Sequence, residues 1–305
     1  MSYEAAPSRR WFAVLNPVSG RGRALRDRAH VESALRAHDL DVRIEMSRYA
    51  GHALPLLAQA LDAGERNILA IGGDGTMHEA ANAILQHPAA SQVTLAPMPV
   101  GTGNDWCRFL GVSSDCAALA ARCARGKTAR FDIGVAAFSS SVPRRYFVNV
   151  AGAGFDAYVI ERMRDRRFGA LAYLVAVMRG LVGFRPQVMR LQADALSHEG
   201  RAFVTFVCVG AYCGGGMKVA PTADAHDGMF DVVQVGDLGR LDVLASLRRL
   251  FDGTIAAHPK VRTLRAASLT LDAPEALAVE ADGELIGKTP VTLSVLPGAL
   301  RVLVD

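Results

Sequence analysis

The first hundred residues alternate short apolar runs with segments of helical periodicity. Between the runs, helices are expected at 24–38, 52–64 and 76–86. Because strict alternation of strands and helices is typical of a parallel sheet covered by helices, we expect an α/β domain here. The apolar runs expected to form its strands are WFAVLN (11–16), DVRIEM (41–46), NILAI (67–71) and VTLAPMPV (93–100).

The pattern changes after about residue 131, where strand-like segments joined by turns replace the alternation. Two helical stretches interrupt them, at 156–181 and 241–251. Sequence of this kind predicts a separate β-rich domain, an antiparallel sandwich or barrel. The turn residues SSSVP (139–143) indicate the boundary region, and we divide the chain into domains at 1–134 and 135–296. The segments expected to form strands are 145–152, 187–194, 201–210, 228–236, 260–273 and 276–287.

Three polar turns rich in glycine follow predicted strands of the first domain, at 16–23, 72–76 and 101–105. The carboxyl ends of parallel strands meet at one edge of a sheet, and ligands gather there. We therefore expect the three turns to lie side by side.

The turn GGDGT (72–76) has the features of a phosphate site. Gly72, Gly73 and Gly75 permit positive φ and remove Cβ bulk, so that amides can point into one concavity at a helix N-terminus. No Gly-Lys-Ser/Thr follows, which excludes a P-loop. Asp74 is compatible with a nearby triphosphate only if a cation lies between them, or if it bonds a hydroxyl or amide, and Mg²⁺ bound with ATP would supply that cation. The alternative is that Asp74 caps a helix beginning near Thr76.

The other two turns strengthen the interpretation as a nucleotide site. In the first, Ser19 and the amides near Gly20 are candidate phosphate ligands, and Arg23 adds a fixed positive charge. The turn at 99–106 repeats the pattern with Thr102, Asn104 and Asp105. The simpler alternative is that Asn104 and Asp105 only hold their turn through side-chain bonds to the backbone.

Composition limits the remaining function classes. Half of the 305 residues are hydrophobic and 21% are charged, as in a folded globular protein. The net charge of +4 is too small to indicate nucleic acid binding, although it permits weak attraction to an anionic membrane. Five cysteines without a CxxC pattern indicate a reducing cytosol and no zinc site. The longest apolar run, 170–178, is far below the ~20 residues of a membrane span, so we expect only peripheral membrane contact, at the inner face.

Taken together, six motifs resemble the diacylglycerol kinase catalytic family, which includes bacterial lipid kinases and the sphingosine and ceramide kinases. They occur in the family's order over nearly the whole chain. GGDGT alone is a weak signal, because NAD kinases and phosphofructokinases have similar turns. The motifs are NPVSGRGR (16–23), GGDGTMHEAAN (72–82), PVGTGNDW (99–106), NVAGAGFDA (149–157), GGGMKVAPTADAHDGMFDV (214–232) and ADGE (281–284).

This resemblance implies a first domain with a phosphofructokinase-like (NAD-kinase-like) fold that binds ATP. It implies a second, β-rich domain with lipid and metal elements, and an active site in the cleft between the two. The last segment, 297–305, is implied to return to the first domain. The resemblance adds Asn16 and Gly101 to the ATP contacts, together with Ser47, where related chains often have threonine. Where this chain has Arg23 the family often has lysine, and the positive charge is kept.

For the second domain, the resemblance implies a structural Mg²⁺ bound by the Asp227 side chain and the backbone carbonyls of Asp224 and Met229. From the residues alone, an Asp-Gly hairpin turn is the simpler interpretation, and Ca²⁺ is as compatible as Mg²⁺. The resemblance also makes Glu284 the general base that takes the proton from a lipid hydroxyl, with Asp74 organising the catalytic magnesium. A hairpin with solvated carboxylates remains the alternative for Glu284.

The resulting expectation is an ATP-dependent lipid kinase that meets its substrate at a membrane surface. Arg162, Arg164, Arg166 and Arg167 flank an apolar stripe within 154–184, and either core packing or contact with lipid headgroups would explain that pattern. An NAD kinase and a non-catalytic nucleotide or lipid sensor remain as alternative functions. The sequence leaves both the acceptor lipid and homodimer formation open.

Overall fold

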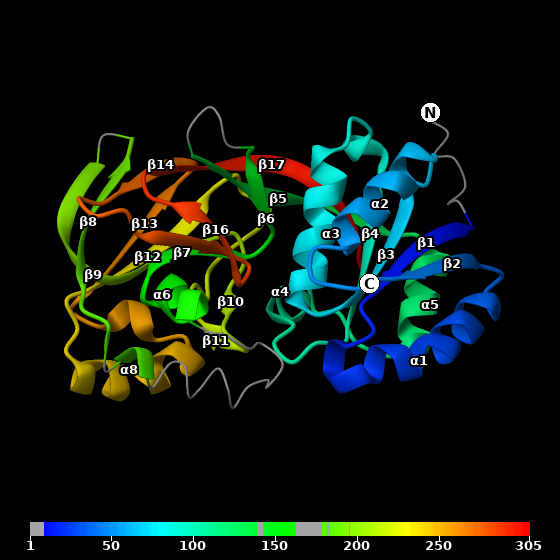
Figure 1. The fold of residues 1–305 in the computed structure, drawn as a ribbon, viewed down its shortest axis with the longest axis horizontal. Coiled ribbons are helices and arrows are strands. Elements are labelled where there is room, and N and C mark those ends of the chain that lie inside the picture. The colour runs from blue at the N-terminus through cyan, green and yellow to red at the C-terminus, as the bar shows by residue number, and fades with distance from the viewer. Residues whose placement is uncertain (1–8, 139–142, 163–178, 182, 195) are drawn as a thin grey trace. The chain divides into compact units, whose positions relative to one another are not determined.

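The computed structural model describes residues 9–138, 143–162, 179–181, 183–194 and 196–305. The chain forms two compact units (Figure 1). One ends at Phe131 and also includes Gly298–Asp305, and the other is Asp132–Pro297.

The first unit contains a parallel sheet in the order β17-β4-β3-β1-β2. Four of its strands are those predicted from the apolar runs, so the predicted α/β architecture is confirmed. The fifth strand comes from the end of the chain, where Arg301 and Val302 pair in parallel with Thr94 and Leu95. The strands are β1 (Arg10–Leu15), β2 (Asp41–Met46), β3 (Asn67–Gly72), β4 (Thr94–Pro99) and the last residues of β17 (Val291–Leu303).

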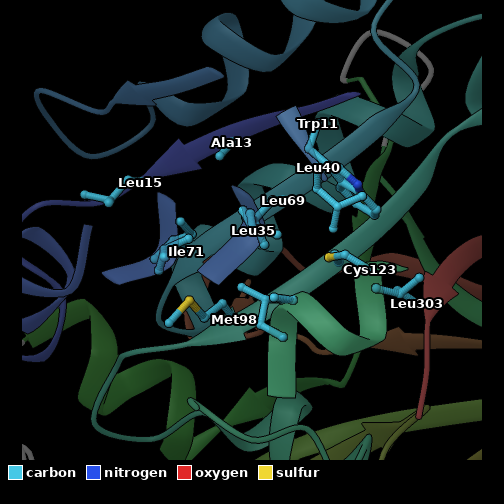
Figure 2. Close-up of a cluster of buried hydrophobic side chains, with 14 of the residues drawn as sticks. Trp11, Ala13, Leu15, Leu35, Leu40, Leu69, Ile71, Met98, Cys123 and Leu303 are labelled. Atoms are coloured by element: carbon cyan, nitrogen blue, oxygen red, sulfur yellow. The ribbon is translucent and has the colours of Figure 1, made fainter. Parts of the chain in front are cut away.

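Helices cover this sheet and enclose its core. The predicted helices appear as α1, α2 and α3, and two shorter helices follow β4. Figure 2 shows one core cluster, in which Leu35 of α1 and Cys123 of α5 pack with Leu69 and Met98 of the strands. Each large apolar side chain buried in this way stabilises the fold by about 1.5–3 kcal/mol. The helices are α1 (Ser19–Arg36), α2 (Ala53–Asp62), α3 (Asp74–Gln86), the 3₁₀ turn η1 (Ala90–Gln92), α4 (Asp105–Phe109) and α5 (Cys116–Arg125).

The second unit is built from antiparallel strands, as its turn-rich sequence predicted. Its central strand β9 pairs with β7, β8 and β12, and β15 pairs with β7 and β16. β17 pairs with β14 before its end joins the first unit. The strands are β5 (Thr128–Ala137), β6 (Arg145–Phe147), β7 (Val150–Gly154), β8 (Gln187–Ala193), β9 (Leu196–Cys208), β10 (Tyr212–Cys213), β11 (Met217–Lys218), β12 (Phe230–Gly236), β13 (Val261–Ala266), β14 (Ser268–Asp272), β15 (Ala278–Ala281) and β16 (Glu284–Lys288).

The helices of this unit are α6 (Phe155–Arg162), α8 (Arg240–Asp252) and the 3₁₀ turn η3 (Ile255–Ala257). α8 confirms the predicted shorter helix. Of the longer predicted helix, 156–181, residues 163–178 lie outside the described residues, and with them Arg164, Arg166 and Arg167. Within the described ranges, no helix has both the length and the apolar character needed to cross a membrane.

Candidate functional site

The three glycine turns of the first unit meet at the carboxyl edge of its parallel sheet. The Asn16 amide donates to the Ile71 carbonyl at 3.0 Å, which joins the first turn to the end of β3. The Val100 amide donates to the Gly72 carbonyl at 2.8 Å, which joins the second and third turns. The expected alignment of the turns follows directly from the parallel register of β1, β3 and β4.

The glycines of the GGDGT turn lack side chains, and this allows neighbouring residues to pack closely against the turn. None of Gly72, Gly73 and Gly75 has positive φ, so the backbone freedom that glycine permits is not used at these three positions. A Cβ on Gly72 would lie 2.2 Å from the Thr76 hydroxyl oxygen, and a Cβ on Gly73 would lie 3.2 Å from the Gly101 Cα. The absence of side chains therefore lets two loops and a helix start pack backbone to backbone.

Asp74 is the first residue of α3, and it does not cap that helix. The N-cap is Gly73, which has no side chain that could bond the first-turn amides. Instead, the Asn104 amide donates to Asp74 Oδ2 at 2.7 Å, which ties the GGDGT turn to the third turn. The other oxygen, Oδ1, is buried and makes no hydrogen bond to any described residue. A buried carboxylate oxygen without a partner is well suited to a bound cation.

The ionisation of Asp74 is unfavourable in the ligand-free protein. Burial, together with the neighbouring carboxylate of Asp105, raises the pKa of Asp74 from 3.8 to about 6, against the lowering effect of the hydrogen bond from the Asn104 amide. Asp105 is itself a buried residue, at the start of α4. A buried carboxylate whose charge is opposed by a neighbouring carboxylate is typical of a site that a cation completes.

Asn104 holds the third turn, as its simpler interpretation proposed. Its side chain accepts from the Gly101 amide at 2.8 Å and donates to the Gly101 carbonyl at 2.9 Å. Asn104 adopts a left-handed conformation, with φ of 53°, which Asn tolerates better than most residues. Thr102 is exposed at the tip of this turn.

Three consecutive residues of the first turn have left-handed backbone angles, and the Arg23 side chain beside them bonds other residues of the unit. Gly20, Arg21 and Gly22 all have positive φ, and a Cβ on Gly20 would lie 2.3 Å from the Val100 carbonyl oxygen. The Arg23 guanidinium donates to Asp27 at 3.1 Å and to the Ser114 hydroxyl at 2.7 Å. Ser19 begins α1, and the Ser47 amide at the end of β2 donates to the Leu15 carbonyl at 2.9 Å.

The close contact of the two turns gives a first testable prediction. In Gly101→Ala, the new Cβ would lie 2.6 Å from the Gly73 Cα and 2.8 Å from Asn104 Oδ1. We expect a loss of about 1–3 kcal/mol in the free energy of unfolding, together with weaker nucleotide binding, measured by denaturant titration and calorimetry. Gly200→Ala is the control, because the nearest atom to its Cβ is in the His198 side chain at 3.3 Å. Equal stability of the two variants would contradict the packing argument.

In the second unit, the turn before Glu284 is held firmly in place. Asp282 and Gly283, both with positive φ, connect β15 to β16. The Asp282 carboxylate accepts from the amides of Val148, Asn149 and Val150 at 3.0, 3.0 and 3.3 Å. Glu284, the first residue of β16, is half-buried. The sequence identified Asp282 as a turn residue, but its role as a clamp on β7 depends on a contact across more than 130 positions of the chain.

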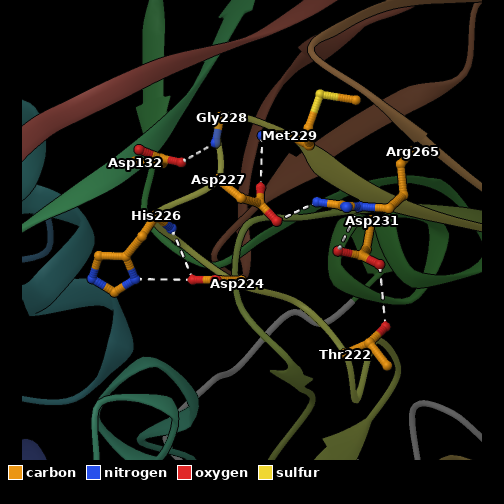
Figure 3. Close-up of polar contacts among 9 residues, drawn as sticks. All are labelled: Asp132, Thr222, Asp224, His226, Asp227, Gly228, Met229, Asp231 and Arg265. Carbon is orange, nitrogen blue, oxygen red and sulfur yellow. Dashed lines mark hydrogen bonds and ion pairs between the residues drawn. The ribbon is translucent and has the colours of Figure 1, made fainter.

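At the turn where a structural metal ion was expected, the Asp227 carboxylate pairs with an arginine side chain (Figure 3). The Arg265 guanidinium forms an ion pair with Asp227 Oδ2, while the Met229 amide donates to Asp227 Oδ1 at 2.9 Å. Asp224 accepts from the His226 amide at 3.1 Å. Among the described residues, no group of three or more His, Cys, Asp or Glu side chains could hold a metal ion. The Asp227 carboxylate is thus already paired with a cationic side chain, and a metal ion at this turn would compete with Arg265 for it.

This ion pair gives a second prediction. Arg265→Gln should leave Asp227 and Asp231 without their shared cationic partner. Because Arg265 is about half exposed, we expect a cost of only about 1 kcal/mol in the free energy of unfolding. Magnesium should raise the thermal midpoint of this variant but not that of the nucleotide-free parent protein. An equal magnesium effect on both proteins would show that the metal and Arg265 do not compete.

Comparison with known proteins identifies the family. Residues 10–136 match the family model of the diacylglycerol kinase catalytic domain, and residues 149–304 match that of the YegS C-terminal NAD kinase beta sandwich-like domain. The chain is 31% identical to a diacylglycerol kinase of Mycobacterium tuberculosis over 297 residues, which is 95% of this chain and 94% of that protein. The chain belongs to the diacylglycerol kinase catalytic-domain family.

Other members of this family agree over the same length. A Pseudomonas aeruginosa protein named "Probable lipid kinase YegS-like" is 29% identical over 88% of this chain and 87% of its own. A crystal structure of a Bacillus anthracis diacylglycerol kinase superposes with a TM-score of 0.73 at 20% identity, over 97% of both chains. A second crystal structure from that organism gives 0.80 at 21% identity, over 100% of this chain and 98% of the other. These structural likenesses confirm the fold class inferred from the sequence.

Proposed function

We propose that the protein is an ATP-dependent kinase that phosphorylates the hydroxyl group of a membrane lipid. Membership of a lipid kinase family gives the reaction class. The observation that carries the proposal for this chain is the unpartnered, buried Asp74 Oδ1 within three packed glycine turns. A carboxylate oxygen in that position would bind the cation that accompanies a polyphosphate held by the turns.

In the proposed reaction, the first unit binds ATP at the turns ending β1, β3 and β4. Backbone amides of 73–75 and 102–103 would hold the phosphate oxygens, assisted by the N-terminal end of α3. The amides of Thr76, Gly101 and Asn104 already donate to protein groups. Asp74 and Asp105 would hold the magnesium that accompanies ATP, and that ion would supply positive charge to the transferred phosphoryl group. Four hydroxyl side chains near the carboxyl edge of the parallel sheet are further candidate ATP contacts: Ser19, Ser47, Thr76 and Thr102.

Glu284 is the proposed general base. As a carboxylate it accepts the proton of the lipid hydroxyl while that oxygen forms a bond to the γ-phosphorus. The bond between the γ-phosphorus and the β–γ bridging oxygen breaks, so that ADP leaves and a phosphorylated lipid remains. The clamp of Asp282 on β7 restricts where Glu284 lies, which suits a residue that has to meet a reacting hydroxyl.

The acceptor is tested by transfer of label from γ-labelled ATP. Diacylglycerol, phosphatidylglycerol, ceramide and sphingosine are offered in anionic vesicles, with and without magnesium. We expect magnesium-dependent labelling of one of these lipids by protein at the vesicle surface. ATP binding without labelling of any lipid would oppose the proposal, and formation of NADP from NAD would instead identify an NAD kinase.

A further inference from the structure

Two carboxyl side chains lie together inside the second unit, away from solvent and beside the turn that precedes Glu284. Glu280, on β15, is only 5% exposed. Asp156, at the start of α6, is partly exposed as a residue, yet its Oδ2 atom is buried. The two side chains interact directly with each other. Neither has a part in the proposed transfer of phosphate.

The backbone is shaped to admit this pair. β7 and β15 are antiparallel, and Glu280 lies opposite Gly152. A Cβ on Gly152 would lie 2.0 Å from Asp156 Oδ2, so the space beside Glu280 exists only because residue 152 has no side chain. After Gly154, with φ of 117°, the chain turns into α6 and places Asp156 over that space.

Backbone amides of described residues donate hydrogen bonds to two of the four carboxyl oxygens. Asp156 Oδ1 accepts from the Ala157 amide at 2.7 Å, and Glu280 Oε2 accepts from the Gly283 amide at 2.8 Å. Asp156 Oδ2 receives no N–H or hydroxyl donor from the described residues. Nor does either carboxyl form an ion pair with a described basic side chain. Two ionised carboxylates cannot stay in contact under these conditions, and a proton shared between them removes the conflict.

The surrounding groups oppose ionisation further. Asp282, in the turn, disfavours charge on Glu280. The charges of Asp231, Glu280 and Asp156 act on the buried Cys208 thiol of β9 and disfavour its ionisation. β7 has no titratable side chain, and β16 contributes Glu284 and Lys288. Burial raises the pKa of Asp156 to about 6, and burial together with the Asp156 charge raises the pKa of Glu280 well above its usual value.

We infer that Asp156 and Glu280 share a proton and act as a positioning pair, which holds the Asp282–Gly283 turn and thereby the direction of Glu284. The link is the bond from the Gly283 amide to Glu280, one residue before Glu284. The turn is then fixed from two sides, by Asp282 on β7 and by Glu280 beneath Gly283. The positioning role rests on the proposed function of Glu284, whereas the shared proton and the hold on the turn do not depend on it.

The shared proton is tested by the pH dependence of stability. For a carboxyl whose pKa is raised by folding, the stabilising protonated form is present at low pH and is lost as pH rises through the folded pKa. The thermal midpoint of the full chain should therefore fall as pH rises from 5 to 8. In the double variant Asp156→Asn/Glu280→Gln, about 5 °C of that fall should disappear. Glu275→Gln, at an exposed position, is the control and should keep the slope of the parent protein.

Single substitutions guard against a double variant that does not fold, and they test the hold on the turn. Glu280→Gln keeps an acceptor for the Gly283 amide, and Glu280→Met removes it. We expect hydrogen exchange at the Gly283 amide to rise at least about tenfold in Glu280→Met only. With an active kinase, Glu280→Met should lower kcat about 10- to 100-fold without changing the KM for ATP, and Glu280→Gln should restore most of it.

Failure of the proposed function and failure of the shared-proton inference would give different results in these measurements. If the parent protein labels no lipid, while the pH slope and the exchange rates change as described, the proposed function fails and the shared proton with its hold on the turn is supported. An unchanged pH slope in the double variant would overturn the shared proton. Equal Gly283 exchange in Glu280→Met and the parent protein would overturn the hold on the turn, and an unchanged kcat in Glu280→Met would overturn the positioning role.

Discussion

Glu284→Gln should lower lipid phosphorylation by about 10³-fold while leaving ATP binding intact. Glutamine keeps the size and hydrogen-bonding shape of the side chain, but it cannot take a proton from a hydroxyl group. Glu284 begins β16 after a turn that Asp282 and Glu280 hold. The substitution should therefore not move the backbone, and the thermal midpoint should stay within a degree or two of the parent protein.

The measurements for this variant are label transfer to the accepted lipid and calorimetric titration with ATP and magnesium. Glu275→Gln serves as the matched control, because it removes an exposed carboxylate from the same unit. Turnover of Glu284→Gln within tenfold of the parent protein would remove Glu284 as the base. A parallel loss of ATP binding would instead indicate a general disturbance of the fold.

Asp74→Asn should be much less active and, without ligands, more stable than the parent protein at pH 8. The pKa of Asp74 is raised from 3.8 to about 6, so its charged form opposes folding. The stabilising protonated form is fully present below pH 3.8 and is lost as pH rises through about 6. Asparagine cannot ionise, and it can still accept from the Asn104 amide. We therefore expect the variant to gain about 2–3 kcal/mol at pH 8 and almost nothing at pH 4.

Activity should change in the opposite direction. Loss of the carboxylate should reduce turnover by about 10²- to 10³-fold and weaken magnesium-dependent ATP binding. Gains in stability on loss of function are characteristic of residues placed for a ligand. Denaturant unfolding at both pH values and the label-transfer assay test this prediction, with Asp41→Asn, an exposed carboxylate at the start of β2, as the control. A less stable variant at pH 8 would mean that Asp74 has a structural role instead.

The sequence predicted the fold where local pattern decides structure. The apolar runs and the helical stretches between them define β1 to β4 and α1 to α3, because each pattern reports which face of its own element is buried. The glycine turns were correctly placed at one sheet edge, since parallel register alone brings Gly72 and Val100 together.

The parts that could not be predicted depend on contacts between distant positions. Nothing near Gly73 in sequence shows that its neighbour is Gly101, so the sequence does not tell which property of that glycine the fold uses. The sequence does not distinguish Arg265 from the other arginines. The pairing of β12 with β13 places Arg265 opposite Asp231, and its guanidinium there forms the ion pair with Asp227. The sequence did not identify Glu280 as a buried carboxyl. It is close to Asp282 and Glu284 in a predicted hairpin, where carboxylates are ordinarily solvated.

The central claim is that Asp74 and Glu284 serve one and the same phosphoryl transfer. It is tested most directly by comparing turnover in the parent protein, Asp74→Asn, Glu284→Gln and the double variant, under identical lipid and magnesium conditions. Residues that act in a single step are strongly non-additive. We predict that the double variant is about as slow as the slower single variant. Losses that multiply across the two substitutions would show independent contributions and contradict the account.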